Sequence, residues 1–393
     1  MPTIVATASS SGTAAQAVAS TTTEIKKQLQ GQAPCLVMAF ASTSQPLGEV
    51  LHGLKQAFPG ATVLGSSTAG EFTQAADAKG STAVFALAGE FQVFAGMGTS
   101  LQADVEGAVG SALKGLPASV PGFPHRTGIL LLDPLSGTGE EATLLVGAAL
   151  GEDVPLAGGA AGDDLHMKAC QVGLDGRAAT DAVVAAVLFS KTRLGLGVCH
   201  GHRALSAPMK VTRAEGNVVH EVEGRPAWEV WKDATRDAAR KANQDPASLK
   251  PDQEGAFLLR YEAALETGSE LKVRAPLSRT PAGAISFACA IPEGATIRIT
   301  ESEPARQVES AREAARRAHD QLKGAPIAGA LVFDCICRNL ILGSQFHDAV
   351  KSISTELGNV PLAGYETYGE IALSAGDLSG FHNTTTVVLA FPR

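Results

Sequence analysis

The chain has 393 residues, of which 45% are hydrophobic and 18% are charged, and its formal net charge is -8. This length exceeds one ordinary hydrophobic core and implies two or more lobes. The negative charge, together with the lack of a Lys/Arg stripe, argues against a nucleic-acid partner, because phosphate binding requires a basic field.

The first part of the chain predicts strands and helices that alternate. Apolar residues at i, i+3, i+4, i+7 and i+11 from Leu47 indicate an amphipathic helix. We expect a strand near Thr3–Ala8, a helix near Thr13–Leu29, a strand at Cys35–Phe40, a helix at Leu47–Phe58 and a returning strand at Ser81–Ala88. The next part predicts a similar order, with an extended start at Phe91–Ser100, a helix over Val105–Leu113, a strand at Gly128–Leu132 and a return at Val183–Phe189.

A region of different pattern follows, and then the first pattern returns. We expect strands at Leu194–Gly201, Met209–Val211, Val218–Val222, Phe257–Leu259, Ile285–Ala290 and Thr296–Thr300, with a helix at Pro226–Ala242. The last part predicts a helix at Pro304–Leu322, a strand at Ala328–Phe333, a helix at Gln345–Leu357 and a return at Thr384–Phe391. The helix from Trp228 separates a predicted N-terminal domain, residues 1–227, from a smaller C-terminal one, residues 228–393.

The chain repeats one unit three times. The run VPLAG stands at 154–158 and at 360–364, with the looser ATVLG at 61–65, and each is followed by Gly and an acid. An ungapped alignment places Gly65, Thr68, Gly70 and Glu71 over their equivalents Gly364, Thr367, Gly369 and Glu370. We expect the third unit to start at Ala295–Glu301. The predicted fold is α/β, with three internally repeated strand-helix-strand-helix units in mixed β-sheets, arranged as two lobes.

The cysteines and the hydropathy pattern indicate in which cellular compartment the protein is expected. None of the six cysteines forms a C-x-x-C pair, and they do not read as a disulfide framework. The start of the chain lacks a basic segment followed by a sustained apolar run, and no eighteen consecutive residues are apolar. The sequence therefore predicts a cytoplasmic protein without membrane insertion.

Five segments, taken in order, resemble the FIST domains, N-terminal and C-terminal halves together. They are GSSTAGE at 65–71, VTRAEGN at 211–217 leading to GRPA at 224–227, FDCICR at 333–338, GYETYGE at 364–370 and HN at 382–383. The resemblance implies a sensory, non-catalytic module that binds a small ligand and reports to signalling enzymes. The FDCICR version is similar to the NosP branch, which implies haem b, nitric oxide as input, and a partner histidine kinase or cyclic-di-GMP enzyme. A homo-oligomer is compatible with this reading.

His347 is the first candidate for an axial ligand to haem iron. It falls in the first turn of the helix after Ala328–Phe333, near the strand end where open α/β sheets bind ligands. Arg338, in the loop after the same strand, could pair a propionate. Tyr365 and Tyr368 add bulk and polarity to the third unit alone. The alternatives are a partly exposed helix-start histidine with a local hydrogen bond, and a surface ion pair between Arg338 and a nearby acid.

The Gly-x-x-Thr-x-Gly-Glu loops are the candidate ligand pocket. Glycines let backbone N–H groups approach a ligand, Thr supplies a hydroxyl and the acid can hold an amine. The predicted ligand-binding residues are Thr68, Glu71, Glu366, Thr367, Glu370 and Asn383. In the alternative interpretation, each Gly-Glu is a turn whose acid caps backbone donors. Two other functions stay open: a haem-free amino-acid sensor that uses Glu71 and Glu370, and a hydrolase or isomerase that uses Thr68, Glu71 or Glu370.

Overall fold

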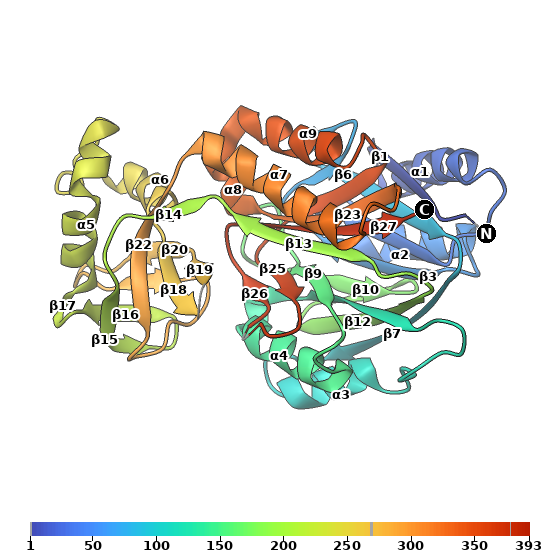
Figure 1. Cartoon of the computed structure of the whole chain (residues 1–393), viewed down its shortest axis with the longest axis horizontal. Coiled ribbons are helices and arrows are strands. Elements are labelled where there is room, and N and C mark those ends of the chain that lie inside the picture. The colour runs from blue at the N-terminus through green and yellow to red at the C-terminus, as the bar shows by residue number, and fades with distance from the viewer. Residues whose placement is uncertain (1, 268–269, 378) are drawn as a thin grey trace.

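A computed structural model describes residues 2–267, 270–377 and 379–393. The elements form a large body and a smaller lobe beside it (Figure 1). The smaller lobe, residues 201–303, is a single insertion between β13 (Gly195–His200) and α7 (Pro304–Gln321), and the body contains the chain on both sides of it. The predicted mixed α/β fold with two lobes is confirmed.

Three repeat units build the body. The first contains β1 (Ile4–Ser11), α1 (Ala14–Leu29), β2 (Leu36–Ala41), α2 (Leu47–Ala57), β3 (Thr62–Ser67), β4 (Glu71–Thr73), β5 (Asp77–Ala78) and β6 (Ser81–Ala88). The second contains β7 (Phe91–Thr99), α3 (Val105–Leu113), β8 (His125–Leu132), α4 (Gly139–Leu150), β9 (Leu156–Ala160), β10 (Val172–Leu174), β11 (Arg177–Ala179) and β12 (Ala182–Ser190). The third contains β13, α7, β23 (Ile327–Cys335), α8 (Ile336–Leu342), α9 (Phe346–Glu356), β24 (Leu362–Thr367), β25 (Glu370–Leu373), β26 (Phe381–His382) and β27 (Thr385–Pro392).

Each of the three units contributes a β-hairpin to the sheet of another unit. Within each sheet, the first strand of a unit pairs with its last strand, and the second and third strands follow, giving β1-β6-β2-β3, β7-β12-β8-β9 and β13-β27-β23-β24. A hairpin from another unit completes each sheet: β10–β11 the first, β25–β26 the second and β4–β5 the third. The same order in all three sheets confirms the predicted triplication.

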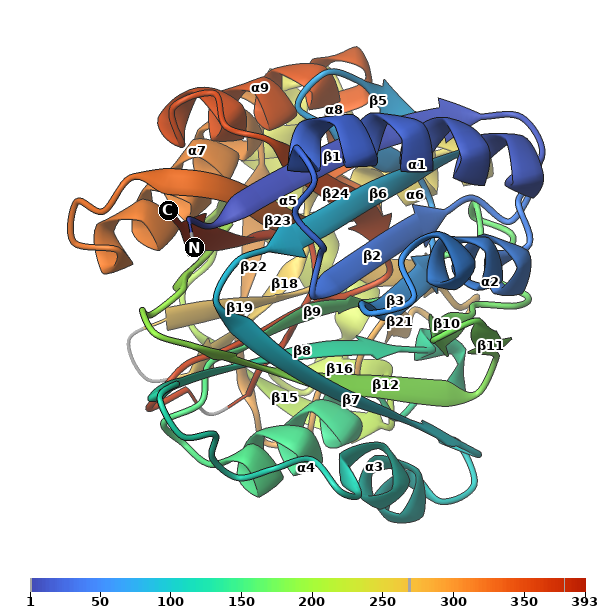
Figure 2. The ribbon, with the colours of Figure 1, turned by 90° about the vertical axis from the view of Figure 1, so that its right-hand side faces the viewer.

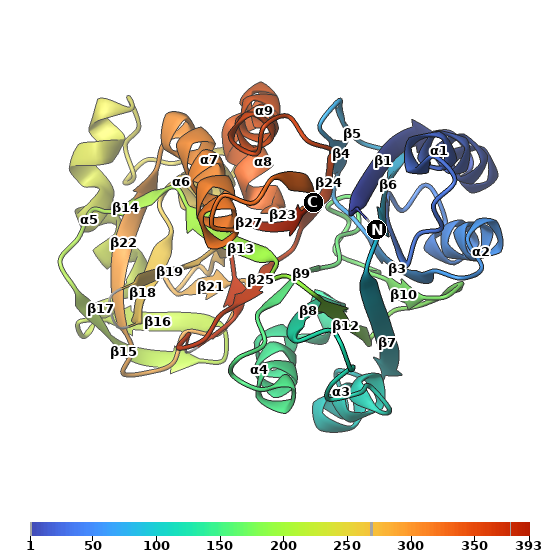
Figure 3. The same cartoon turned by 45° about the vertical axis from the view of Figure 1, so that its right-hand side comes forward.

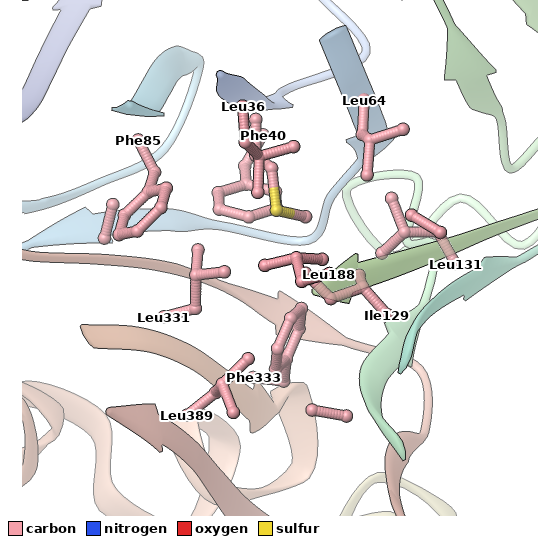
Figure 4. Packing of buried hydrophobic residues seen from close by; sticks show 14 of the residues in the cluster. Leu36, Phe40, Leu64, Phe85, Ile129, Leu131, Leu188, Leu331, Phe333 and Leu389 are labelled. Carbon is pink, nitrogen blue, oxygen red and sulfur yellow. The ribbon is translucent and has the colours of Figure 1, made fainter. Parts of the chain in front are cut away.

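The sheets are buried on both faces. Helix pairs α1/α2, α3/α4 and α7/α9 lie on the outside of the body, as Figures 2 and 3 show. The inner faces of the three sheets meet in one core, where Phe40 and Phe85 face Leu331 and Phe333, with Ile129 and Leu188 beside them (Figure 4). Strands buried on both faces carry continuous apolar runs, and this explains why β2, β6 and β12 were readable from the sequence.

The smaller lobe packs helices against a fourth sheet. Its elements are β14 (His202–Ala204), β15 (Met209–Glu215), β16 (Val218–Val222), β17 (Arg225–Pro226), α5 (Ala227–Lys241), α6 (Pro251–Arg260), β18 (Ala263–Thr267), β19 (Glu270–Arg274), β20 (Pro276–Arg279), β21 (Ile285–Phe287) and β22 (Thr296–Ser302). Trp231 and Phe257 lie in its core. The predicted strand at Phe257–Leu259 is wrong, because Pro251 opens a helix there and its apolar residues form one helical turn.

The start predicted for the third unit is also wrong. All of Ala295–Glu301 except its first residue lies in β22 of the smaller lobe. The third unit instead begins with β13, which pairs with β27 as β1 pairs with β6. In space, most of residues 304–393 joins residues 4–200 in the body, and the division at residue 227 stays a prediction. Within the described ranges, no helix combines the length and apolar character needed to cross a bilayer.

Candidate functional site

In the two Gly-x-x-Thr-x-Gly-Glu loops, the glutamates accept hydrogen bonds from residues of their own repeat unit. The Thr68 hydroxyl donates to one oxygen of Glu71, and the Ser81 N–H and hydroxyl donate to the other at 3.1 and 2.7 Å. In the third unit, Thr367 donates to Glu370 in the same way, and the Thr385 N–H donates at 3.0 Å. Each acid thus joins its loop to the first residue of the last strand. This geometry matches the alternative in which the acid caps backbone donors.

Burial sets the protonation of these acids. Glu71 and Glu370 are 1% and 0% exposed. Removal from water raises the pKa of Glu71 to about 7, and it raises the pKa of Glu370 well above its usual range. Thr68, Glu71, Thr367 and Glu370 do not line the cleft described below. They position the hairpins that the units exchange.

Glycines are required where these loops meet. A Cβ atom on Gly70 would lie 2.6 Å from the Glu366 carboxyl carbon, and one on Gly162 would lie 2.6 Å from the Ala69 nitrogen. Glu366 is itself buried and accepts a hydrogen bond of 2.5 Å from the Asn339 side chain. Burial raises the pKa of Glu366 to about 8. Glu366 therefore belongs to the junction between units and does not line the cleft.

His347 and Arg338 have different surroundings: the first is exposed and the second is buried. The His347 side chain is 54% exposed, and its Nδ1 lies 3.1 Å from Asp77 Oδ1 on the hairpin of the first unit. Arg338 is fully buried, donates to Asp334 at 2.7 Å and to Ser310 at 2.9 Å, and also contacts Gln307. His347 is partly exposed, as its alternative had it, but it pairs with an acid of the first unit rather than locally. Arg338 pairs with a nearby acid inside the fold rather than at the surface, and its guanidinium is fully engaged there.

The two tyrosines have different surroundings. Tyr365 is buried and stacks on Phe40 with ring centroids 4.8 Å apart, so it belongs to the central core. Tyr368 is half-buried and lines a hollow at the junction of the lobes. Asn383 lines the same hollow. Of the predicted site residues, Tyr368 and Asn383 are brought together at a cavity.

This hollow, which we call the interlobe cleft, has a volume of about 260 Å³. The body contributes Pro134, Leu135, Leu165, Met167, Cys335, Ile336, Cys337, Leu340, Tyr368 and Asn383, and the smaller lobe contributes Gly255, Leu259, Ala275, Pro276, Leu277 and Ala288. A second hollow of about 350 Å³ shares Pro134, Ala288 and Tyr368 with it. None of the described residues that line the interlobe cleft is charged.

The rim of the interlobe cleft carries unusually exposed apolar side chains. Leu165, Met167, Leu277 and Leu340 are 45%, 52%, 50% and 48% exposed, and Leu144, which lines the adjoining hollow, is 42% exposed. These five are the large hydrophobic residues that stand out as exposed in the described part of the chain. Because exposed apolar side chains that gather at one cavity mark interaction sites, the interlobe cleft is the best candidate for the functional site.

A strained loop presents two of these side chains. Asp164, Leu165 and Met167 have φ values of 54°, 66° and 54°, in the left-handed region that non-glycine residues avoid. Asp163 holds the loop by accepting the N–H groups of Met167 and Lys168 at 2.8 and 2.5 Å. Burial opposes ionisation of Asp163, yet these bonds and one from Tyr368 keep its pKa below the ordinary value. Asp163 thus fixes the backbone of the loop, while the side chains of Leu165 and Met167 line the cleft.

Several polar contacts join the two lobes, and three of them involve Arg274, Ala275 and Glu262 of the smaller lobe. Arg274 of the smaller lobe, 2% exposed, lies 2.7 Å from the Glu140 carboxylate at the start of α4. The Ala275 N–H of the smaller lobe donates to the Asn383 side chain at 3.4 Å. The Thr384 hydroxyl lies 2.8 and 2.9 Å from the two oxygens of buried Glu262. The positions of the two lobes are therefore coupled to the residues that shape the cleft.

Sequence reasoning missed most of the cleft. Leu165 and Met167 stand in a short polar stretch, and their exposure becomes visible only in the folded chain. Cys335 and Cys337 lie in the FDCICR segment, which carries a family resemblance. That segment was the available signal, but it directed attention to Arg338, whose neighbours face the cleft while Arg338 itself does not.

Comparison with known proteins identifies two family models along the chain. The FIST N domain matches residues 35–225 and the FIST C domain matches residues 227–373. An uncharacterized protein of Mycobacterium tuberculosis is 28% identical over 204 residues, which are 49% of this chain and 50% of the relative. An uncharacterized protein of Mycobacterium bovis is 30% identical over 198 residues, 49% of each chain. The chain spans about half the length of these curated relatives.

Proposed function

Because the chain belongs to the FIST family, whose domains are sensory and bind ligands in signal transduction, we propose that it senses a small, uncharged, largely apolar ligand in the interlobe cleft. The observation that carries this proposal is the gathering of exposed apolar side chains around a cavity whose described lining has no charged residue. Burying a charged ligand group against such a lining would cost several kcal/mol, on the order of the desolvation of an unpaired ion.

The same chemistry argues against the amino-acid alternative. A zwitterionic amino acid needs partners for its amine and carboxylate, and Glu71 and Glu370 are buried and hydrogen bonded within their loops. The hydrolase or isomerase alternative relies on the same side chains. Thr68, Glu71 and Glu370 line none of five hollows found in the described part of the chain.

Haem at His347 does not fit the residues present. The imidazole is exposed and pairs with Asp77, and Arg338 has its guanidinium occupied by buried partners. The interlobe cleft offers Tyr368, Met167 and Cys337 as groups that iron accepts, but its described lining supplies no basic side chain for a propionate. Nitric oxide as input rests on the NosP resemblance alone.

Signal output follows from the place of the cleft between the lobes. A ligand that contacts Leu277 of the smaller lobe and Leu340 of the body at the same time favours one arrangement of the lobes. We propose that a separate signalling enzyme, a histidine kinase or a cyclic-di-GMP enzyme, reads this arrangement. The partner class comes from the family resemblance.

A neutral apolar dye tests the binding proposal. Nile red gains fluorescence in apolar surroundings, and we expect saturable enhancement with the wild-type chain. Ala288→Trp, which places a large ring at the cleft, is expected to reduce the enhancement at least tenfold. Ala282→Trp is the matched control, because Ala282 is an exposed alanine of the same lobe outside the cleft lining. Equal binding by the two tryptophan variants would reject the interlobe cleft as the site.

A further inference from the structure

Two of the cysteines lie together in the wall of the interlobe cleft. Cys335 ends β23 and caps α8, and Cys337 lies in the first turn of α8. Both line the cleft, and both are free thiols. Cys335 is 2% exposed, whereas Cys337 is partly exposed. The pair therefore has one sulfur that solutes can reach and one sulfur behind it.

The backbone holds the two thiols at a distance that a disulfide can span. Ile336, the residue between them, is helical, and a helical middle residue places the flanking Cα atoms about 5.4 Å apart. Disulfides accept Cα separations of about 4.4–6.8 Å. The Cys335 thiol also interacts with the Cys337 side chain and backbone. The Cα separation and the side-chain contact therefore both bring the pair within the range of a disulfide.

The other cysteines lack this arrangement. Cys35, Cys170, Cys199 and Cys289 are separated from any other cysteine by many residues of sequence. Burial raises the pKa of Cys335 well above its ordinary value, so this sulfur is a protonated thiol in the reduced chain. An accessible thiol beside a protected resolving thiol is the usual arrangement of a reversible redox pair.

We propose that Cys335 and Cys337 form a reversible disulfide when a peroxide enters the interlobe cleft. The Cys337 sulfur attacks one peroxide oxygen; an S–O bond forms, the O–O bond breaks, and hydrogen peroxide leaves a sulfenic acid and one water. The Cys335 sulfur then attacks the Cys337 sulfur. An S–S bond forms, the S–O bond breaks, and the departing hydroxyl takes the Cys335 proton as a second water.

The disulfide would act on the junction of the lobes. It fixes the start of α8, and α8 packs against α6 of the smaller lobe. It also removes two thiol hydrogens from the cleft wall. Oxidation and ligand binding thus act on the same surface, although the disulfide can form whether or not the cleft holds an apolar ligand.

One proteolytic peptide reports the reaction. Cleavage after Lys323 and Arg338 releases residues 324–338, which contain Cys335 and Cys337 and no other cysteine. The full chain is treated with hydrogen peroxide, alkylated with iodoacetamide and digested with trypsin. The masses of the peptides are then measured by mass spectrometry. We expect this peptide to lack both alkyl groups and to be two hydrogen atoms lighter than its reduced form. Dithiothreitol before alkylation should restore two alkyl groups.

Two variants and a control make the test specific. In Cys335→Ser, which lacks the resolving thiol, dimedone should trap a sulfenic acid on Cys337. Cys199→Ser, which removes a half-buried cysteine away from the cleft, should leave the disulfide yield unchanged. Two alkyl groups on the peptide after peroxide, or a link from it to a different peptide, would overturn the proposal. Failure of Nile red binding would bear on the proposed ligand and leave this result intact.

Discussion

The Tyr368 hydroxyl donates a hydrogen bond of 2.7 Å to the Asp163 carboxylate and accepts one of 2.8 Å from the Leu165 N–H. The first residue belongs to the third unit and the other two belong to the loop of the second. A side chain that the sequence marked as peculiar to the third unit therefore holds the strained loop that forms one rim of the interlobe cleft.

Removing this hydroxyl should loosen the loop. Tyr368→Phe keeps the ring and deletes both hydrogen bonds, one of them to an ionised group, so we expect a loss of about 1–3 kcal/mol in the free energy of unfolding. Hydrogen exchange at the Leu165 and Met167 amides should accelerate at least tenfold. Urea unfolding and exchange mass spectrometry measure the two effects. Unchanged exchange in this loop would contradict the role given to Tyr368.

The Arg274–Glu140 ion pair should contribute to holding the lobes. Glu140→Ala leaves a guanidinium that is 2% exposed without its carboxylate, and removal of one partner of a buried pair costs about 3–5 kcal/mol. Since Glu140 is itself 31% exposed, we expect a loss near the lower end of that range. Glu221→Ala, which breaks the exposed pair with Arg213, is the control and should cost less than about 1 kcal/mol. Equal urea midpoints for both variants would show that the interlobe pair is not stabilising.

The buried acid Glu71 gives stability a definite dependence on pH. Its pKa is raised from 4.5 to about 7 in the folded chain, so the folded state holds the proton more tightly than the unfolded state does. Its contribution is fully present below pH 4.5 and is lost as the pH rises through about 7, by up to about 3 kcal/mol. Glu366, whose pKa is raised to about 8, acts in the same direction.

Substitution isolates the Glu71 contribution. Glu71→Gln is neutral at all pH values, so the difference in unfolding free energy between pH 5 and pH 8 should be smaller in this variant than in the wild type. Glu49→Gln, at an exposed position on α2, is the control and should keep the wild-type difference. Urea titrations at the two pH values supply the numbers. A Glu71→Gln chain with the full wild-type pH difference would refute this assignment.

His347 should be dispensable for folding and for any binding of haem. The side chain is 54% exposed and its pair with Asp77 is at the surface, so His347→Ala should change stability by less than about 1 kcal/mol. The Soret absorbance after haemin addition should be the same for the variant and the wild type. A Soret band present in the wild type and lost in His347→Ala would restore the predicted axial ligand.

The repeats could be predicted from the sequence, whereas the interlobe cleft could not. Strands such as Ser81–Ala88 and the helix Leu47–Ala57 were predicted to within one or two residues, because burial imposes a continuous or helical apolar pattern. The start of the third unit was missed because the smaller lobe separates β13 from α7. The cleft depends on Leu165, Leu277 and Leu340, which are distant in sequence and meet only through the hairpin exchange and the docking of the lobes.

The roles of the acids show the same limit. The alignment of Glu71 with Glu370 correctly identified equivalent residues, and the turn alternative described their bonding. Whether a Gly-Glu turn faces a ligand or the interior depends on where the following hairpin goes. That hairpin crosses to another sheet, which local sequence patterns do not reveal.

Photolabelling with a neutral alkyl diazirine tests the interlobe cleft most directly. On irradiation such a probe inserts into the side chains that surround it, and peptide mass spectrometry identifies them. We expect labels on Leu165, Met167, Leu277 and Leu340 in the wild type and their loss in Ala288→Trp. Labels confined to other surfaces, or the same labels in both chains, would contradict it.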